Sequence, residues 1–245
     1  MRALRALILG AVLAAGCGGE PASRAHHRAA VPEPLEDCAA AAGAGWRALA
    51  TSGRYRPPSA ARPGDGRTGV VFANDSNNET CAWAGEARAL AGKGYAIAVF
   101  ETGGSPVYEA RQARAVVAGL RGTGARRIAL IGASVGARAV LQVAARPPSG
   151  VAGVVALSAE RRVRSNPADL LPLTHRIRLP VLSVGSRRDP LTSFGDDTRA
   201  FGRAIPGART LVLSGGDHGV DFLTDRHRRR VRAAILAFLR TRVAG

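Results

Sequence analysis

The sequence has little of several residue types, and these shortages bear on the kinds of site it can hold. Its 245 residues contain three Cys, one lysine (Lys93) and 4% aromatic residues. Cys38 and Cys81 lie too far apart for a zinc finger, and no two histidines are spaced as ligands on one helix. No phosphate-binding G-x-x-x-x-G-K-[ST] motif occurs, which argues against nucleotide chemistry. We therefore expect no metal and no cofactor.

Acidic residues are also scarce. The chain has 18 Asp and Glu against 35 Lys and Arg, which gives a formal net charge of +17. Such a charge favours binding to nucleic acid or to an anionic surface, but no nucleic-acid module accompanies it, and few aromatic residues are available to stack on bases. We interpret the charge as a solvated arginine surface and predict no nucleic-acid partner.

Long apolar runs are absent beyond residue 20, so no membrane-spanning helix is expected there. The N-terminus itself is typical of an export signal. Arg2 and Arg5 precede the short apolar run 6–15, and small residues lead to Cys17. The segment resembles a bacterial lipobox, although Leu13 lies four residues before the cysteine instead of three. We predict a lipoprotein signal peptide over 1–17, with Cys17 lipidated and the protein anchored to the cell envelope. Plain secretion is the alternative.

The remaining chain is expected to have two parts. Residues 18–44 are rich in Ala, Pro, Gly and charge, which predicts a flexible tether. Residues 45–245 are long enough for one domain with a full core. Its first part, residues 53–68, is expected to be irregular, with a degenerate first strand near residues 46–50.

From Gly69 onward, short β-branched apolar runs alternate with longer segments of helical period. The expected strands are 70–73, 95–100, 127–131, 151–157, 181–184 and 210–213. The expected helices are 81–91, 107–120, 135–145, 198–204 and 225–243. This alternation predicts an α/β fold: a three-layer α/β/α sandwich around a mainly parallel sheet. Functional groups in such sheets gather beyond the carboxyl ends of the strands.

One strand end carries a G-x-S-x-G motif. The apolar run 128–131 leads into Gly132, Ser134 and Gly136, and a helical segment follows. The turn between strand and helix is tight, so its flanking positions must be small. Ser134 then lies at a helix N-terminus, where backbone N–H groups favour developing negative charge. We predict that Ser134 is a nucleophile, with the Val135 N–H as one oxyanion donor.

A serine nucleophile needs a histidine base. Two of the five histidines, His26 and His27, fall in the expected tether, His175 precedes a strand, and His227 lies in the arginine run of the last helix. Only His218 follows a late strand within a glycine-rich loop. It is therefore the predicted base.

The base in turn needs an orienting acid. Asp189 follows the strand 181–184 and precedes His218, which is the chain order Ser, acid, His. Asp196, Asp197 and Asp217 are competing candidates, and we predict Asp189 because of its place at the strand end.

These motifs together resemble the α/β-hydrolase family, over about residues 69–240. The likeness is to small lipoprotein and dienelactone-hydrolase-like serine hydrolases of high-GC bacteria. It implies that Ser76 supplies the second oxyanion donor, with Asp75 as the alternative. Many relatives have His-Gly where this chain has Asn74 and Asp75, and many have Gly in place of Ala137. Dienelactone hydrolases proper use a Cys nucleophile, so their substrate does not transfer to Ser134.

The predicted function is hydrolysis of an ester-like acyl bond in a small-molecule substrate, through an acyl-enzyme on Ser134. A peptidase or acyltransferase on the same residues, or an inactive binding module, are the alternatives. In this fold large lids lie between the sixth and seventh strands, and here the connection 159–180 is short, which predicts a minimal lid. Its arginines at 161–164 either favour an anionic substrate or are merely solvated. The oligomeric state is left open.

The cysteine count also leaves a pair. Lipidation of Cys17 would leave Cys38 and Cys81 in an oxidising compartment, which favours a disulfide between them. Two free thiols are the alternative, because Cys38 lies in the expected tether.

Overall fold

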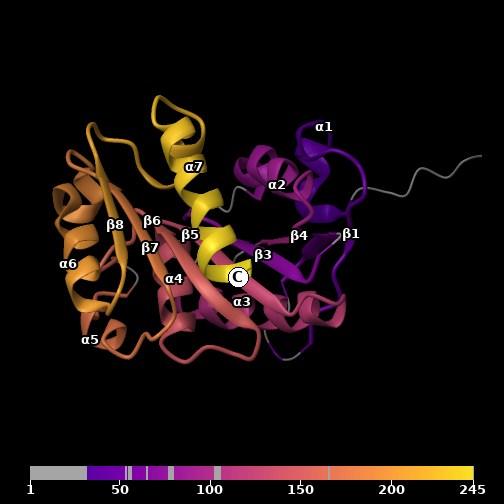
Figure 1. The fold of residues 1–245 in the computed structure, drawn as a ribbon, viewed down its shortest axis with the longest axis horizontal. Helices are drawn as coiled ribbons and strands as arrows, with labels where there is room; N and C mark the ends of the chain where they lie inside the picture. Colours follow the sequence, from indigo (N-terminus) through magenta and orange to yellow (C-terminus); the bar gives the residue numbers. More distant parts are fainter. Residues whose placement is uncertain are drawn as a thin grey trace, which may run out of the picture. The chain divides into compact units, whose positions relative to one another are not determined.

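The computed structural model describes residues 32–52, 54, 57–64, 66–76, 80–101, 106–164 and 166–244. Within these residues, strands form one eight-stranded sheet in the order β1-β2-β4-β3-β5-β6-β7-β8 (Figure 1). The strands are β1 Arg47–Ala48, β2 Ser59–Arg62, β3 Thr68–Ala73, β4 Ala96–Phe100, β5 Arg127–Ala133, β6 Val151–Leu157, β7 Val181–Ser186 and β8 Arg209–Leu213. Only the β1–β2 and β2–β4 pairs are antiparallel. The predicted mainly parallel sheet is confirmed.

Helices cover both faces of the sheet. The α-helices are α1 Ala39–Ala42, α2 Ala84–Ala91, α3 Pro106–Gly122, α4 Val135–Ala144, α5 Leu171–Thr174, α6 Asp196–Ala204 and α7 Arg228–Phe238. The 3₁₀ segments are η1 Glu33–Cys38, η2 Thr80–Trp83, η3 Pro190–Gly195 and η4 Gly219–Leu223, and α7 continues into a π-helical turn, η5 Leu239–Ala244. Figure 1 shows α7 crossing one face of the sheet and α3 and α4 lying behind it.

Two apolar cores lie on the opposite faces because successive strand residues point in opposite directions. In β3, Val71 packs with α3 and α4, whereas Val70 and Phe72 pack with α2 and α7. Phe72 stacks on Trp83, with ring centroids 4.7 Å apart. The buried runs that predicted parallel strands therefore supply both cores of the three-layer sandwich.

One strand was not predicted. β2 lies within residues 53–68, for which irregular backbone was expected, and it pairs with β4 through Ser59–Phe100 and its neighbours. Its sequence, Ser-Ala-Ala-Arg, has no β-branched or aromatic residue, so propensity gives no signal. Pairing with the exposed edge of β4 determines its conformation instead.

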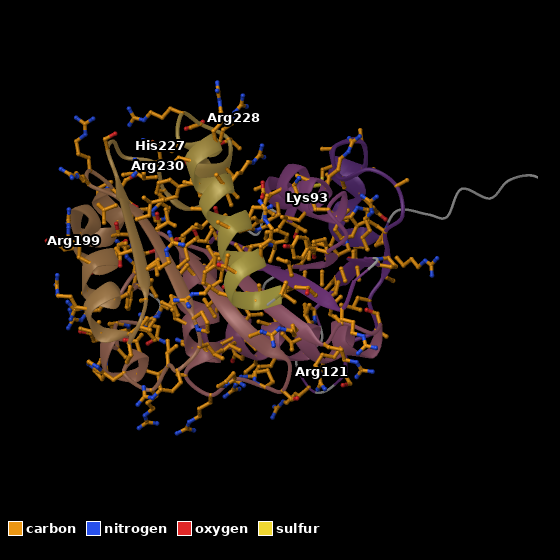
Figure 2. All side chains as sticks on the ribbon, in the orientation of Figure 1. Lys93, Arg121, Arg199, His227, Arg228 and Arg230 are labelled. Atoms are coloured by element: carbon orange, nitrogen blue, oxygen red, sulfur yellow. A yellow bond between two sulfur atoms is a disulfide. The ribbon has the colours of Figure 1, made fainter. Side chains whose placement is uncertain are left out.

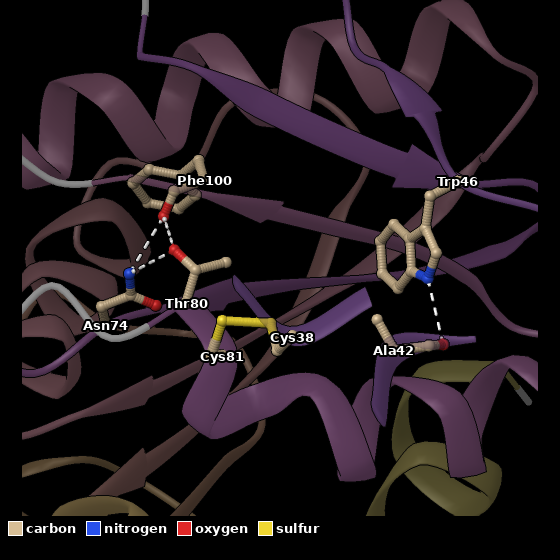
Figure 3. The surroundings of a disulfide bond; sticks show 7 residues. All are labelled: Cys38, Ala42, Trp46, Asn74, Thr80, Cys81 and Phe100. Carbon is tan, nitrogen blue, oxygen red and sulfur yellow. Dashed lines mark hydrogen bonds between the residues drawn. A yellow bond between two sulfur atoms is a disulfide. The ribbon is translucent and has the colours of Figure 1, made fainter. Parts of the chain in front are cut away.

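The segment before residue 45 differs from the predicted tether in its last part. Residues 33–42 form η1 and α1, and Leu35 and Ala42 are fully buried against the domain. The Trp46 indole N–H donates to the Ala42 carbonyl at 3.2 Å. Cys38 and Cys81 form a disulfide that ties η1 to η2 (Figure 3). The folded part of the chain thus begins before the predicted boundary, and residues 1–31, including Cys17, lie outside the described residues.

Removing this disulfide is expected to destabilise the domain. Cys38 and Cys81 are 43 residues apart, and a loop of that length is worth about 4 kcal/mol in the chain-entropy model, with measured values commonly about 2–4 kcal/mol. We expect the free energy of unfolding, measured in urea, to be about 2–4 kcal/mol lower in the Cys38→Ser, Cys81→Ser double variant. The bridge itself is checked by thiol titration of unreduced Cys17→Ser protein, in which only Cys38 and Cys81 remain. Two reactive thiols would contradict the bridge.

The connection between β6 and β7 is short, as predicted. Its described residues hold an isolated bridge between Val163 and Asn166 and the four-residue helix α5. These described residues form no inserted cap domain, in agreement with the predicted minimal lid. No helix among the described residues has the length and apolar character needed to cross a bilayer.

Candidate active site

The strand-to-helix turn at the end of β5 carries Ser134. Its backbone has φ 52° and ψ −117°, a strained conformation for a residue with a side chain. A Cβ on Gly132 would lie 2.3 Å from the Gly136 carbonyl oxygen, and one on Gly136 would lie 2.2 Å from the Asn74 carbonyl oxygen. Both positions therefore require glycine, which is the steric reason for the G-x-S-x-G pattern.

A buried aspartate and a histidine meet at the ends of β7 and β8. The Asp189 carboxylate is fully buried and accepts from His218 Nδ1 at 2.8 Å and from the Leu191 amide at 3.0 Å. Burial alone would raise the pKa of Asp189, but the hydrogen bond and charge of His218 outweigh it, so this pKa lies below its ordinary value. The carboxylate is thus ionised and orients the imidazole through Nδ1.

The pKa of His218 is shifted in the opposite direction. Burial lowers it, but the hydrogen bond and charge of Asp189, with the charges of Glu160 and Asp75, raise it above its ordinary value. No hydrogen-bond partner reaches Nε2 from the described residues. That nitrogen is available to exchange a proton at pH values near neutrality.

The predicted site residues line one pocket of about 560 Å³. Ser134, Val135, Ser76 and His218 all contribute to its wall, and so does Asp75. Asp189 lies behind His218 and outside the pocket lining. The pocket's other lining residues are Glu160, Val163, Arg164 and Leu191. The structure therefore brings together the residues that the sequence predicted from four separate strand ends, those of β3, β5, β7 and β8.

Glu160 is a site residue that the sequence analysis missed. Ser134 Oγ donates to Glu160 Oε1 at 3.0 Å. Burial raises the pKa of Glu160, while the hydrogen bond from Ser134 and the charge of His218 lower it, and the net direction is upward. Glu160 follows β6 by three residues, so the rule that functional groups gather beyond strand ends was the signal available for it.

The loop that carries Glu160 is held by a buried arginine. Arg138, one turn after Ser134 in α4, is 1% exposed. Its guanidinium donates to backbone carbonyls within the stretch 160–168, namely those of Glu160, Arg161, Asn166 and Ala168. Burial lowers the pKa of Arg138, and the carboxylates around it oppose that shift. Arg138 thereby fixes the loop to the helix that begins at the predicted nucleophile.

A second missed residue supports the histidine loop. Ser158, directly after β6, is fully buried and has φ 52°. Its Oγ accepts from the Gly219 amide at 3.1 Å. Gly219 is itself in the left-handed region, at φ 54°. The strained turn after β6 thus helps to hold His218 beside Asp189.

The loop after β3 has its own anchor, shown in Figure 3. Asn74 is fully buried, and its Nδ2 donates to Thr80 Oγ1 at 3.0 Å and to the Phe100 carbonyl at 3.1 Å. Thr80 precedes Cys81, so the segment that the disulfide ties to η1 is also held at the end of β4 by this amide. Asn74 therefore has a structural role here.

The three competing acids are engaged elsewhere. Asp196 pairs with Arg199 at 2.9 Å, and Asp197 accepts from the Arg161 amide at 2.9 Å. Asp217 accepts from His227 Nδ1 at 2.7 Å. These contacts leave Asp189 as the acid that the structure brings to His218.

Two of the five arginines in the β6–β7 connection form an ion pair with an acid. Arg161 and Arg162 both form ion pairs with Asp169. Arg164 is exposed and lines the pocket. Elsewhere the basic side chains labelled in Figure 2 lie on several elements, with Arg199 on α6, Arg121 on α3, and Arg228 and Arg230 on α7. The positive charge is therefore spread over the domain.

Within the described residues, no group of three or more His, Cys, Asp or Glu side chains could hold a metal ion. The stretch 64–69 fits the pattern G-x-G-x-x-G. It leads into β3, whereas a dinucleotide-binding loop follows a strand and opens a helix. We therefore assign no metal ion to the described residues and no dinucleotide to the stretch 64–69.

Comparison with known proteins rests on structure alone. No family model matches the chain, and no curated protein matches it. An esterase of Pyrococcus furiosus superposes with a TM-score of 0.65 at 15% identity, over 82% of this chain and 90% of the esterase. An enol-lactonase of Burkholderia xenovorans gives 0.58 at 16%, over 74% and 96%. The chain has the α/β-hydrolase fold. A proline iminopeptidase of Mycobacterium smegmatis also resembles this fold, with a TM-score of 0.63 at 12% identity, over 80% of this chain and 97% of the peptidase.

Proposed function

We propose that the chain is a serine hydrolase that cleaves an ester-like acyl bond. One observation carries this proposal: Ser134, on a strained turn, lines the same pocket as His218, whose ring is oriented by the buried carboxylate of Asp189. The esterases and the lactonase that share the fold lend it support at the level of reaction class. The finer likeness to small lipoprotein and dienelactone-hydrolase-like enzymes is part of the proposal and rests on the motifs.

The proposed reaction has two steps. Ser134 Oγ attacks the acyl carbon while its proton passes to His218 Nε2, and the alcohol leaves with that proton. The N–H groups of Val135 and Ser76 hold the oxyanion. Water, deprotonated by His218, then releases the acyl group and restores Ser134. Because the hydroxyl donates to Glu160 in the resting protein, it must turn toward His218 as substrate enters.

An inactive binding module is the competing function, and that same hydrogen bond favours it, since a serine held by Glu160 is not yet paired with its base. Labelling with a fluorophosphonate probe separates the two. An activated Ser134 forms the adduct and Ser134→Ala does not, whereas a binding module gives no adduct at all.

The pocket predicts a preference for short acyl groups. It measures about 560 Å³, and its apolar lining comes from Val135, Val163 and Leu191. Each CH₂ sequestered from water contributes about 0.8 kcal/mol, so long chains gain rate only where apolar wall continues. We expect kcat/KM for p-nitrophenyl esters to peak among short acyl chains. A steady rise from acetate to palmitate would contradict the minimal lid.

We also propose export and lipid anchoring through Cys17, with plain secretion as the alternative. This part rests on the sequence of residues 1–17 alone.

A further inference from the structure

The Glu160 carboxylate lies beside the predicted nucleophile, Ser134. Its Oε1 lies 3.0 Å from Ser134 Oγ, and its side chain is half-buried in the wall of the pocket. When Ser134 turns to His218 and bonds to the acyl carbon, Glu160 loses this donor. A partly desolvated carboxylate without a donor is costly, so the bound substrate is expected to supply one.

We propose that Glu160 binds a protonated amino group on the acyl part of the substrate, so that the preferred substrates are esters of α-amino acids. This inference rests on the proposed function, because it assumes that the acyl group is transferred to Ser134. Glu160 acts in it as a specificity-determining residue. The base in the reaction is still His218.

Bond geometry favours an amine on the α-carbon. The nitrogen of an α-amino acyl group lies two bonds from the acyl carbon, or about 2.5 Å from it by standard bond lengths. The acyl carbon bonds to Ser134 Oγ after that oxygen has turned toward His218, and in the resting protein the same oxygen lies 3.0 Å from Glu160 Oε1. An α-ammonium group is therefore carried into the region that the carboxylate already reaches. A plain acyl chain brings only C–H groups there.

The charges around the pocket favour the same substrate. Glu160 lines it, and among the described residues of the lining Arg164 is the only arginine or lysine. The Arg164 side chain is exposed, so solvent screens its charge. Arg161, the next cation along the loop, is paired with Asp169. A cationic amine beside Ser134 meets the opposite charge of Glu160. An anionic substrate, which the arginines at 161–164 could have favoured, would meet like charge there.

The loop is built to keep Glu160 in place. Arg138 donates to the backbone carbonyls of Glu160 and Arg161, and its own side chain is buried. Because the loop backbone at Glu160 is already held, only the side chain loses conformational entropy when the carboxylate binds a cation. This is the arrangement expected of a recognition group, because an adaptable surface acid would need to be ordered first.

The test compares three methyl esters by proton release in a pH-stat: alanine, N-acetylalanine and propionate. At a pH of about 7 the amine of alanine methyl ester is largely protonated, since α-amino groups have a pKa near 7.7–8.0. We expect wild-type kcat/KM to be roughly 10- to 100-fold higher for the alanine ester than for the N-acetylalanine ester, as for a hydrogen bond between charged groups. In Glu160→Gln that ratio is expected to fall about tenfold or more.

Glu36→Gln is the matched control, since Glu36 lies exposed in η1 and outside the pocket. Its ratio should equal that of the wild type. If the wild type hydrolyses the alanine and N-acetylalanine esters at equal rates, the inference is overturned. If it also hydrolyses methyl propionate, the proposed function still stands. An unchanged ratio in folded Glu160→Gln would also overturn the inference. A wild type that hydrolyses none of the esters and takes no fluorophosphonate label overturns the proposed function and this inference together.

Discussion

Replacing Ser134 with alanine is expected to lower kcat for ester hydrolysis by about 10⁴- to 10⁶-fold, and His218→Ala is expected to do the same, because the members of such a unit act together. Ser134 lies on a strained strand-to-helix turn at the N-terminus of α4, and it lines the pocket. Without its hydroxyl, water must attack the substrate directly. The measurement is kcat for p-nitrophenyl acetate, with circular dichroism to confirm that the fold is intact.

The control for this prediction is Ser149→Ala, which removes an exposed hydroxyl in the connection between α4 and β6. It should retain wild-type activity. Retention of more than about a tenth of the activity in Ser134→Ala or His218→Ala would be incompatible with their assigned roles, given the size of effect expected.

The parallel part of the fold was predictable because burial on both faces leaves a simple signature. β5, β6 and β7 are almost wholly buried, and their continuous apolar runs are what a central parallel strand requires. β2 was not predictable, because its small residues acquire their conformation only by pairing with β4. Strand formation there is a tertiary effect, which local propensity does not predict.

The N-terminal segment was misjudged for a related reason. Its Ala, Pro and Glu composition is typical of a linker, yet Leu35 is fully buried and the disulfide at Cys38 holds the segment on the domain. One buried leucine and one cross-link outweigh composition when a neighbouring surface is complementary. The cysteine pairing was the only part of this contact that the sequence could suggest.

In the site, too, some residues were predictable from the sequence and others were not. Ser134, Asp189 and His218 could be found because each follows a strand, and parallel strands bring their carboxyl ends to one edge. Glu160 could not be assigned, since its approach to Ser134 depends on the course of the loop 159–169. That course is set by Arg138, whose burial and carbonyl partners are properties of the folded chain. Nothing in the sequence indicates that this helical arginine holds a loop in place.

The conservative change Asp189→Asn is expected to lower kcat by about 10⁴-fold while leaving the site's shape intact. Asp189 accepts hydrogen bonds from the Leu191 amide on Oδ1 and from His218 Nδ1 on Oδ2, and the Ser158 side chain is a further hydrogen-bond partner. An asparagine offers one acceptor oxygen and one NH₂ group. If the oxygen stays with Leu191, the NH₂ group faces Nδ1 and favours the tautomer with the proton on Nε2. That tautomer cannot accept the proton of Ser134.

The pH profile provides an independent check of the same change. His218 must be neutral to act as a base, and its pKa is raised above the ordinary value, against the effect of burial, chiefly by Asp189. Wild-type kcat/KM should therefore rise with pH through that elevated pKa. In Asp189→Asn the negative charge is gone, so the pKa of His218 falls and the acidic limb of the profile moves to lower pH, at a much lower maximum. An acidic limb that stays in place, or a loss of less than about tenfold, would show that another group orients His218.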